Sequence, residues 1–204
     1  MTARLLPVLL LASARVAAQE PAGAAQQASY AASASLYFLE DDEDYLQPTV
    51  ALDRDRLHLE ARYNYEDRDT ASAWIGINLA AGDALSLEFT PMLGVVAGGT
   101  KGIAPGFRGT LSWRSLALYS EAEYVFDADD SSESFLYSWS ELTLAPAEHW
   151  RIGIVAQRTR VYETDFDIQR GLLLGASFSR LDVTAYVLNP DESPTVVLAA
   201  AAGF

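Results

Sequence analysis

The chain has 204 residues, with 14 Lys and Arg against 28 Asp and Glu, a formal net charge of −14, and no cysteine. The acidity argues against nucleic acid as a partner, and the missing cysteines exclude a disulfide framework, a lipid-modified cysteine and a thiolate metal site. Hydrophobic residues make up 50% of the chain although no long apolar run is present outside its first residues. An alternating pattern of apolar and polar residues would account for the high hydrophobic content and for the absence of long apolar runs.

The first residues are typical of a secretory signal peptide. Arg4 precedes an apolar stretch over residues 5–12, and small residues follow at 16–18. The competing interpretation is an uncleaved helical anchor, but the stretch is too short to cross roughly 30 Å of hydrocarbon and Arg15 interrupts it. We therefore expect a signal peptide over residues 1–18, a short periplasmic segment over 19–28 and a single barrel domain over 29–204.

Strands with one apolar and one polar face recur along the remaining chain. Leu57, Leu59 and Ala61 alternate with His58, Glu60 and similar polar residues, which is the pattern of a strand with two different faces. Breaking the chain at its Asp, Asn, Gly, Pro and Ser clusters predicts about twelve such strands. They lie near 29–39, 46–53, 56–66, 71–80, 84–95, 104–113, 116–127, 134–144, 150–162, 167–179, 181–189 and 194–204.

The connections between these strands alternate between two classes. Short turns such as Arg114-Ser115 alternate with longer acidic loops such as 127–134, as expected for periplasmic turns and external loops of a membrane barrel. The glycine-rich stretch 94–106 is predicted to be the tip of a long hairpin, with a flexible lid as the alternative. The fold class is therefore all-β, a transmembrane antiparallel up-and-down barrel of about twelve strands, with ten or eight as alternatives.

Aromatic residues near the strand ends support this fold, because membrane barrels carry aromatic girdles at both interfaces. Alternation places them on the apolar face. The predicted girdle residues are Tyr65, Trp113, Phe126, Trp150, Phe178 and Phe204.

The final strand places Val196, Leu198, Ala200, Ala202 and Phe204 on one face. This ending resembles the C-terminal signal of bacterial outer-membrane β-barrel proteins, although Ala202 stands where many members carry a second aromatic residue. The resemblance implies an outer-membrane location, recognition by the barrel-assembly machinery and contact with outer-membrane lipids including lipopolysaccharide.

A soluble β-barrel or sandwich, with the apolar face inside, is the competing interpretation, because alternation alone does not separate the two folds.

The polar face of the predicted barrel carries charges of both signs. The candidate lumen-lining residues are Glu60, Arg62, Glu88, Arg108, Glu121, Glu123, Glu141 and Arg151. Charges at this density must pair or stay hydrated. The sequence thus favours a narrow passive channel for small polar solutes, with cation preference from its excess of Glu. The alternative is a structural or surface-interaction barrel whose lumen is closed by ion pairs.

An enzyme is the least favoured function. Outer-membrane lipid-modifying enzymes need a base within reach of a nucleophile, and both histidines, His58 and His149, fall at the predicted periplasmic end. The sequence contains no phosphate loop, zinc motif or serine-hydrolase elbow, so we expect no cofactor and no metal.

Three arginines depart from the alternation, because the parity of their strands directs them toward lipid. They are Arg158, Arg160 and Arg170. Near the top of an apolar band about 25 Å tall, a guanidinium can reach a lipid phosphate, so they are candidate lipopolysaccharide contacts. The competing interpretation is a bulge near Gln157 that turns two of them inward.

Overall fold

The computed structural model describes residues 28–39, 43–161, 167–191 and 194–204, with only the backbone for 159–161 and 167. The predicted signal peptide and most of the segment that follows it lie outside these residues. None of the helices in the described part is long and apolar enough to cross a membrane. The elements are β1 (Ser29–Phe38), β2 (Tyr45–Arg54), β3 (Leu57–Tyr63), β4 (Ala71–Ile77), β5 (Leu79–Ala81), β6 (Leu85–Ala97), β7 (Gly102–Trp113), β8 (Leu116–Asp127), the short 3-10 helix η1 (Ser131–Glu133), β9 (Phe135–Ala147), β10 (Trp150–Val161), β11 (Asp167–Phe178), β12 (Leu181–Leu188) and β13 (Thr195–Gly203).

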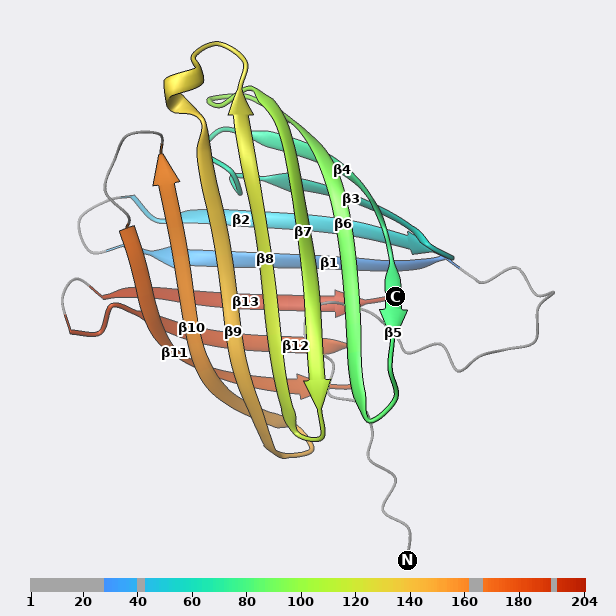
Figure 1. The fold of residues 1–204 in the computed structure, drawn as a ribbon. Helices are drawn as coiled ribbons and strands as arrows, with labels where there is room; N and C mark the ends of the chain where they lie inside the picture. Colours follow the sequence, from blue (N-terminus) through green and yellow to red (C-terminus); the bar gives the residue numbers. More distant parts are fainter. Residues whose placement is uncertain (1–27, 40–42, 162–166, 192–193) are drawn as a thin grey trace, which may run out of the picture.

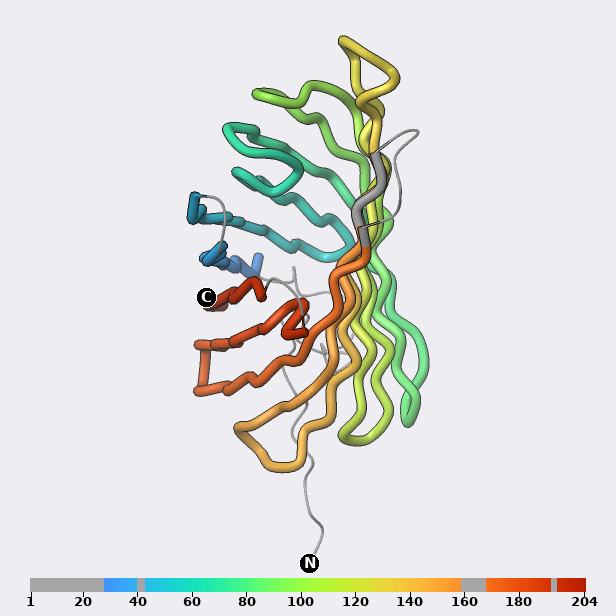
Figure 2. The backbone as a smooth tube through the Cα atoms, turned by 90° about the vertical axis from the view of Figure 1, so that its left-hand side faces the viewer, coloured from blue at the N-terminus to red at the C-terminus, as the bar shows by residue number. Residues whose placement is uncertain are grey.

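All of these strands belong to one antiparallel sheet that closes on itself. Except for β4 and β5, which both pair with β6, strands that follow one another in sequence are neighbours in the sheet. The sheet closes where β1 pairs with β13, from Ala31↔Gly203 to Phe38↔Val196. In Figure 1 the strands β6 to β11 cross in front of β1 to β4, β12 and β13, and Figure 2 shows β1 and the C-terminal residues of β13 side by side. The fold is a closed up-and-down barrel.

The predicted number of strands is confirmed once β4 and β5 are taken together. Both pair with β6, and the chain between them is interrupted at Asn78, whose backbone N–H donates to the Arg56 carbonyl at 2.7 Å. The predicted segment 71–80 thus occupies the position of a single strand in the barrel wall, and this strand is interrupted near its C-terminal end. Over the described residues the wall has twelve such positions.

Side chains alternate between the outside and the inside of the barrel with the predicted parity. Along β12 Leu181, Val183 and Val187 are exposed while Asp182 and Thr184 are buried. The exposed large side chains include many aliphatic residues from most of the strands, and the buried set includes Glu, Arg, Asp and His. Burying charges while exposing Leu and Ile is unfavourable in water and favourable in lipid. The soluble interpretation, which needs the apolar face inside, is therefore wrong.

The two ends of the barrel differ, as the connection pattern predicts. At one end, here called the turn end, two-residue turns join β2 to β3, β7 to β8 and β11 to β12, with positive φ at Asp55, Arg114 and Ser179. The other end, the loop end, carries the longer connections. The hairpin tip predicted within 94–106 is confirmed, because β6 continues to Ala97 and β7 begins at Gly102.

Candidate functional site

The interior of the barrel contains a cavity of about 130 Å³. A smaller cavity of about 60 Å³ lies toward the turn end and shares Ser33, Thr49, Glu60 and Arg108 with the first. The larger cavity is lined by carboxylates, arginines and aromatic side chains together: Glu60, Glu121, Glu141, Arg62, Arg108, Arg151, Tyr37, Tyr65, Tyr119, Tyr137, Tyr186 and Trp139, with smaller residues of β1, β2 and β13.

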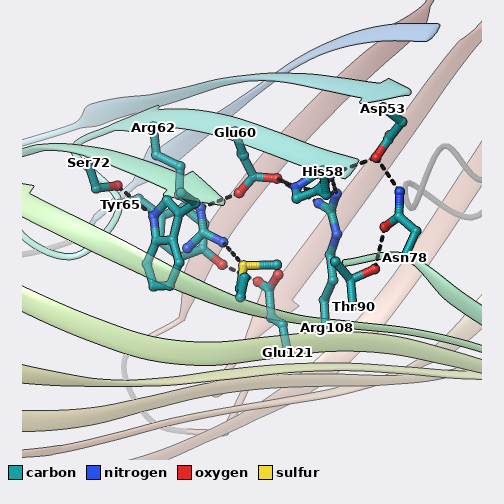
Figure 3. A network of polar contacts seen from close by, with 12 residues as sticks. Asp53, His58, Glu60, Arg62, Tyr65, Ser72, Asn78, Thr90, Arg108 and Glu121 are labelled. Carbon is teal, nitrogen blue, oxygen red and sulfur yellow. Dashed lines mark hydrogen bonds and ion pairs between the residues drawn. The ribbon is translucent and has the colours of Figure 1, made fainter. Parts of the chain in front are cut away.

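An ion pair between Glu60 and Arg108 borders both cavities. Arg108 Nη1 donates to Glu60 Oε2 at 2.7 Å, and Arg108 Nη2 lies 2.9 Å from His58 Nε2. Glu60 lies on β3 and Arg108 on β7, which are not neighbours in the sheet, so the pair spans the interior. Figure 3 shows Arg108 reaching toward Glu60 and His58. The contact therefore places an ion pair across the interior, in the lining of both cavities.

His58 continues this network toward the turn end. It is fully buried, and its Nδ1 lies 2.7 Å from Asp53 Oδ1. Asn78, at the interruption between β4 and β5, donates to the same Asp53 oxygen at 2.6 Å and accepts from Thr90 at 2.7 Å. The break in the wall therefore places an amide where it satisfies a carboxylate inside the barrel.

Arg62 makes a second contact across the interior. Its Nη1 donates to Glu123 Oε2 on β8 at 2.7 Å, and its Nε donates to Glu60. The guanidinium also lies 4.2 Å from the centre of the Tyr65 ring and 4.5 Å from that of Trp74, within the range of cation–π attraction. Arg62 is thus held on several sides.

Arg151 and Asp182 form a third ion pair. Arg151 Nη2 donates to Asp182 Oδ1 at 2.7 Å, while Nη1 donates to the other carboxylate oxygen. The arginine crosses over β11 at Gly175, where a Cβ would lie 2.5 Å from Arg151 Cζ. A glycine at this position allows β10 and β12 to be linked over the strand between them.

The remaining candidate carboxylates have no cationic partner among the described residues. Glu121 accepts hydrogen bonds from the hydroxyls of Tyr65 and Tyr119. Glu141 accepts from Trp139 and Tyr186. Glu88 faces inward and lines neither cavity, and its side chain makes no hydrogen bond or ion pair within the described part of the chain.

Sequence reasoning missed the apolar and aromatic side chains of the interior. Two buried clusters fill much of it: one consists of Tyr37, Trp139, Val155, Leu173, Tyr186, Leu188, Val197 and Ala199, the other of Trp74, Met92, Val96, Ala104, Val125 and Phe135. All have the inward parity of their strands, so alternation could have found them. The predicted interior was based on charged residues alone, and the observed interior is less polar than predicted.

The predicted girdle residues are placed on the outer surface with one exception. Trp113, Phe126, Trp150 and Phe178 are about half exposed and Phe204 is 68% exposed. Tyr65 is a correction, because it points inward, lines the larger cavity and meets Tyr137 edge-on at 5.5 Å. The alternation fails because β3 ends at Tyr63 and Asn64 has φ of 56°, which reverses the direction of the next side chain.

The three arginines predicted to face lipid are only partly described. Arg170 is exposed at the loop end and donates to Asp191 at 2.9 Å, and Arg158 lies on the outward parity of β10. The side chain of Arg160 lies outside the described residues. The bulge near Gln157 is not found, because the pairing of β10 with β9 runs in register from Ile152 to Val161; the register shift lies between Trp150 and Ile152. Contact with lipopolysaccharide stays a prediction.

The loop end carries carboxylates that retain their charge. Hydrogen bonds from the hydroxyl and backbone N–H of Ser132 lower the pKa of Asp130, and the hydrogen bond from Arg170 lowers the pKa of Asp191. Both groups therefore stay ionised to a lower pH than a free aspartate. In the described part of the chain, no group of three or more His, Asp or Glu side chains is placed to hold a metal ion.

Comparison with known proteins places the fold but not a family. No protein-family model matches the sequence, and no curated protein matches it. Among solved structures, the chain is similar to a KdgM porin, with a TM-score of 0.61 and 9% identity over 85% of this chain and 99% of the porin. It is also similar to a KdgM porin in complex with disordered oligogalacturonate, with a TM-score of 0.59 and 10% identity over 86% and 99% of the two chains. The chain therefore has the closed twelve-stranded barrel fold of these porins.

Proposed function

We propose that this protein is an exported outer-membrane barrel that forms a narrow passive channel for small polar solutes. The observation that supports this most strongly is the reversed burial, in which a polar cavity is enclosed by a wall whose outer surface is apolar. Such a wall is stable in a bilayer and encloses a hydrated path. The fold shared with porins supports the same function.

The charges of the interior favour cations. Arg62, Arg108 and Arg151 are each paired with a carboxylate, whereas Glu121 and Glu141 are paired with neutral donors. A cation on the path thus meets carboxylates that have no arginine within hydrogen-bond distance in the described part of the chain. The similar porin is described in complex with oligogalacturonate, an acidic sugar chain, and this interior is poorly suited to such an anion.

A structural barrel that passes no solute is the competing function. The two apolar clusters and the ion pairs that cross the interior favour it, since they fill space that a wide pore would leave open. We assign no enzymatic role, because His58 is held among Asp53, Glu60 and Arg108, and His149 is exposed in a turn.

Conductance of the purified protein in planar lipid bilayers tests the proposal. We expect small single-channel steps in potassium chloride and, under a salt gradient, a reversal potential of the sign for potassium over chloride. The absence of steps above those of detergent alone would favour the structural barrel. A reversal potential showing chloride preference would retain the channel and overturn its cation selectivity.

A further inference from the structure

We infer that the larger interior cavity is a binding site for a small aliphatic amine, with its ammonium group held by Glu121 and Glu141 among tyrosines. The inference rests on the proposed function, because it takes such an amine to be a solute of the channel. It adds a ligand class to the general cation preference.

The hydrogen-bond donors to the two carboxylates are all neutral side chains. Both oxygens of Glu121 accept tyrosine hydroxyls, from Tyr65 and Tyr119. Glu141 Oε1 accepts from Trp139 Nε1 and from the Tyr186 hydroxyl, both at 2.8 Å. Glu141 is 5% exposed, yet its Oε2 receives no hydrogen bond from the described residues and the side chain lines the cavity. A buried carboxylate in this state is stabilised by a positively charged ligand.

The arginines of the cavity make their hydrogen bonds to other carboxylates. Arg62 bridges Glu60 and Glu123, with 2.7 Å to the latter. Arg108 is bound to Glu60 at 2.7 Å, and Arg151 to Asp182 on β12. Figure 3 shows Arg62 and Arg108 directed at Glu60, with Glu121 below them on another part of the wall. Of the three carboxylates that line the cavity, Glu121 and Glu141 therefore receive no hydrogen bond from its arginines.

The register of β8 and β9 sets the two carboxylates at a useful spacing. Glu121 pairs with Trp139 and Tyr119 pairs with Glu141, so the two glutamates are diagonal neighbours on the inner face. Diagonal positions in an antiparallel pair are about 7–8 Å apart at Cα. A single ammonium group can lie between such carboxylates, and a short diamine can reach both.

The walls around the carboxylates suit the alkyl part of an amine. Tyr37, Tyr65, Tyr119, Tyr137, Tyr186 and Trp139 all line the cavity. Aromatic faces attract an ammonium group and also cover methylene groups. A cavity of about 130 Å³ is far larger than the roughly 10–15 Å³ that one water needs on this measure, so it has room for a small organic ion. A strongly hydrated inorganic ion would gain less from such walls.

Calorimetric titration of the folded protein in detergent with butane-1,4-diamine tests the inference. We expect saturable binding of the diamine and no binding of butane-1,4-diol, which has a similar shape and no charge. The variant carrying Glu121→Gln and Glu141→Gln keeps an oxygen acceptor at both positions, and we expect it to weaken binding by about tenfold or more. The control is Glu88→Gln, which removes an inward carboxylate outside the cavity and should change affinity by less than about twofold.

Three results would overturn the inference: no saturable heat with the diamine, equal binding of the diol, or equal weakening in the control and the double variant. Heat-modifiable gel mobility of each variant establishes that it is folded. Because the titration requires no conduction, its failure in a protein that conducts potassium would remove the amine site and leave the channel. Binding by a protein that shows no conductance would instead retain the site and remove its role in transport.

Discussion

Arg62 contacts carboxylates and aromatic rings on more than one side of the interior. It bridges β3 to Glu123 on β8 and is 6% exposed. Arg62→Ala leaves Glu60 and Glu123 buried without this partner, so we expect the free energy of unfolding to fall by about 3–5 kcal/mol. Denaturant unfolding of the protein in lipid vesicles, followed by tryptophan fluorescence, measures this change.

The matched control for Arg62 is Arg170→Ala. Arg170 also pairs with an aspartate, but its side chain is 73% exposed and that of Asp191 57%. Solvent screens such exposed pairs and they contribute little to stability, so this variant should remain close to the wild type. Equal losses in the two variants would show that the ion pairs across the interior do not stabilise the barrel.

Alternation showed which charged residues face inward but not which of them meet. Glu60 and Arg108 are 48 positions apart and lie on strands that are not neighbours. Their contact depends on the curvature and closure of the wall, which no local pattern contains. Tyr65 was misplaced for a related reason, because one residue with positive φ, Asn64, reverses the parity that the sequence shows.

At the level of the strands, close packing inside the wall depends on small residues. The ring of Trp74 on β4 lies against Gly94 on β6, where a Cβ would stand 2.6 Å from Trp74 Cδ2. Trp74 is 3% exposed and donates to Ser72 at 2.9 Å, so the ring has little freedom to move. Gly94→Ala is therefore expected to lower the free energy of unfolding by about 1–3 kcal/mol.

Gly203→Ala is the control for this packing, because a Cβ there would meet nothing within 4 Å. Thermal unfolding of both variants, followed by the loss of heat-modifiable gel mobility, compares them. We expect a lower midpoint for Gly94→Ala alone. A wild-type midpoint for Gly94→Ala would mean that Trp74 is not held against β6.

The strands themselves were well predicted because alternation is a local property. The predicted segments 116–127, 150–162 and 167–179 differ from β8, β10 and β11 by no more than a residue at either end. The interruption at Asn78 was not foreseen, since the apolar parity continues through Ile77 and Leu79. The Asn78 side chain there donates to Asp53 on β2, a partner that the sequence of this segment does not indicate.

For the whole molecule, the central feature is the reversal of inside and outside. An apolar outer wall and a polar, partly filled interior are what the proposed channel requires, and both follow from period-two patterning combined with closure of β1 onto β13. The sequence predicted the outer face well. The apolar clusters inside were missed although their residues have inward parity, because the predicted interior was based on charged residues alone.

Spin-label accessibility along β12 in lipid vesicles tests this feature most directly. The chain has no cysteine, so single replacements at Val183, Thr184, Ala185 and Tyr186 each give one labelled position. Oxygen concentrates in lipid, so we expect high accessibility to oxygen at Val183 and Ala185. We expect low accessibility at Thr184 and Tyr186, in line with the alternating exposure of the strand. High accessibility of Val183 and Ala185 to a water-soluble nickel chelate would contradict this expectation, since those residues would then face water.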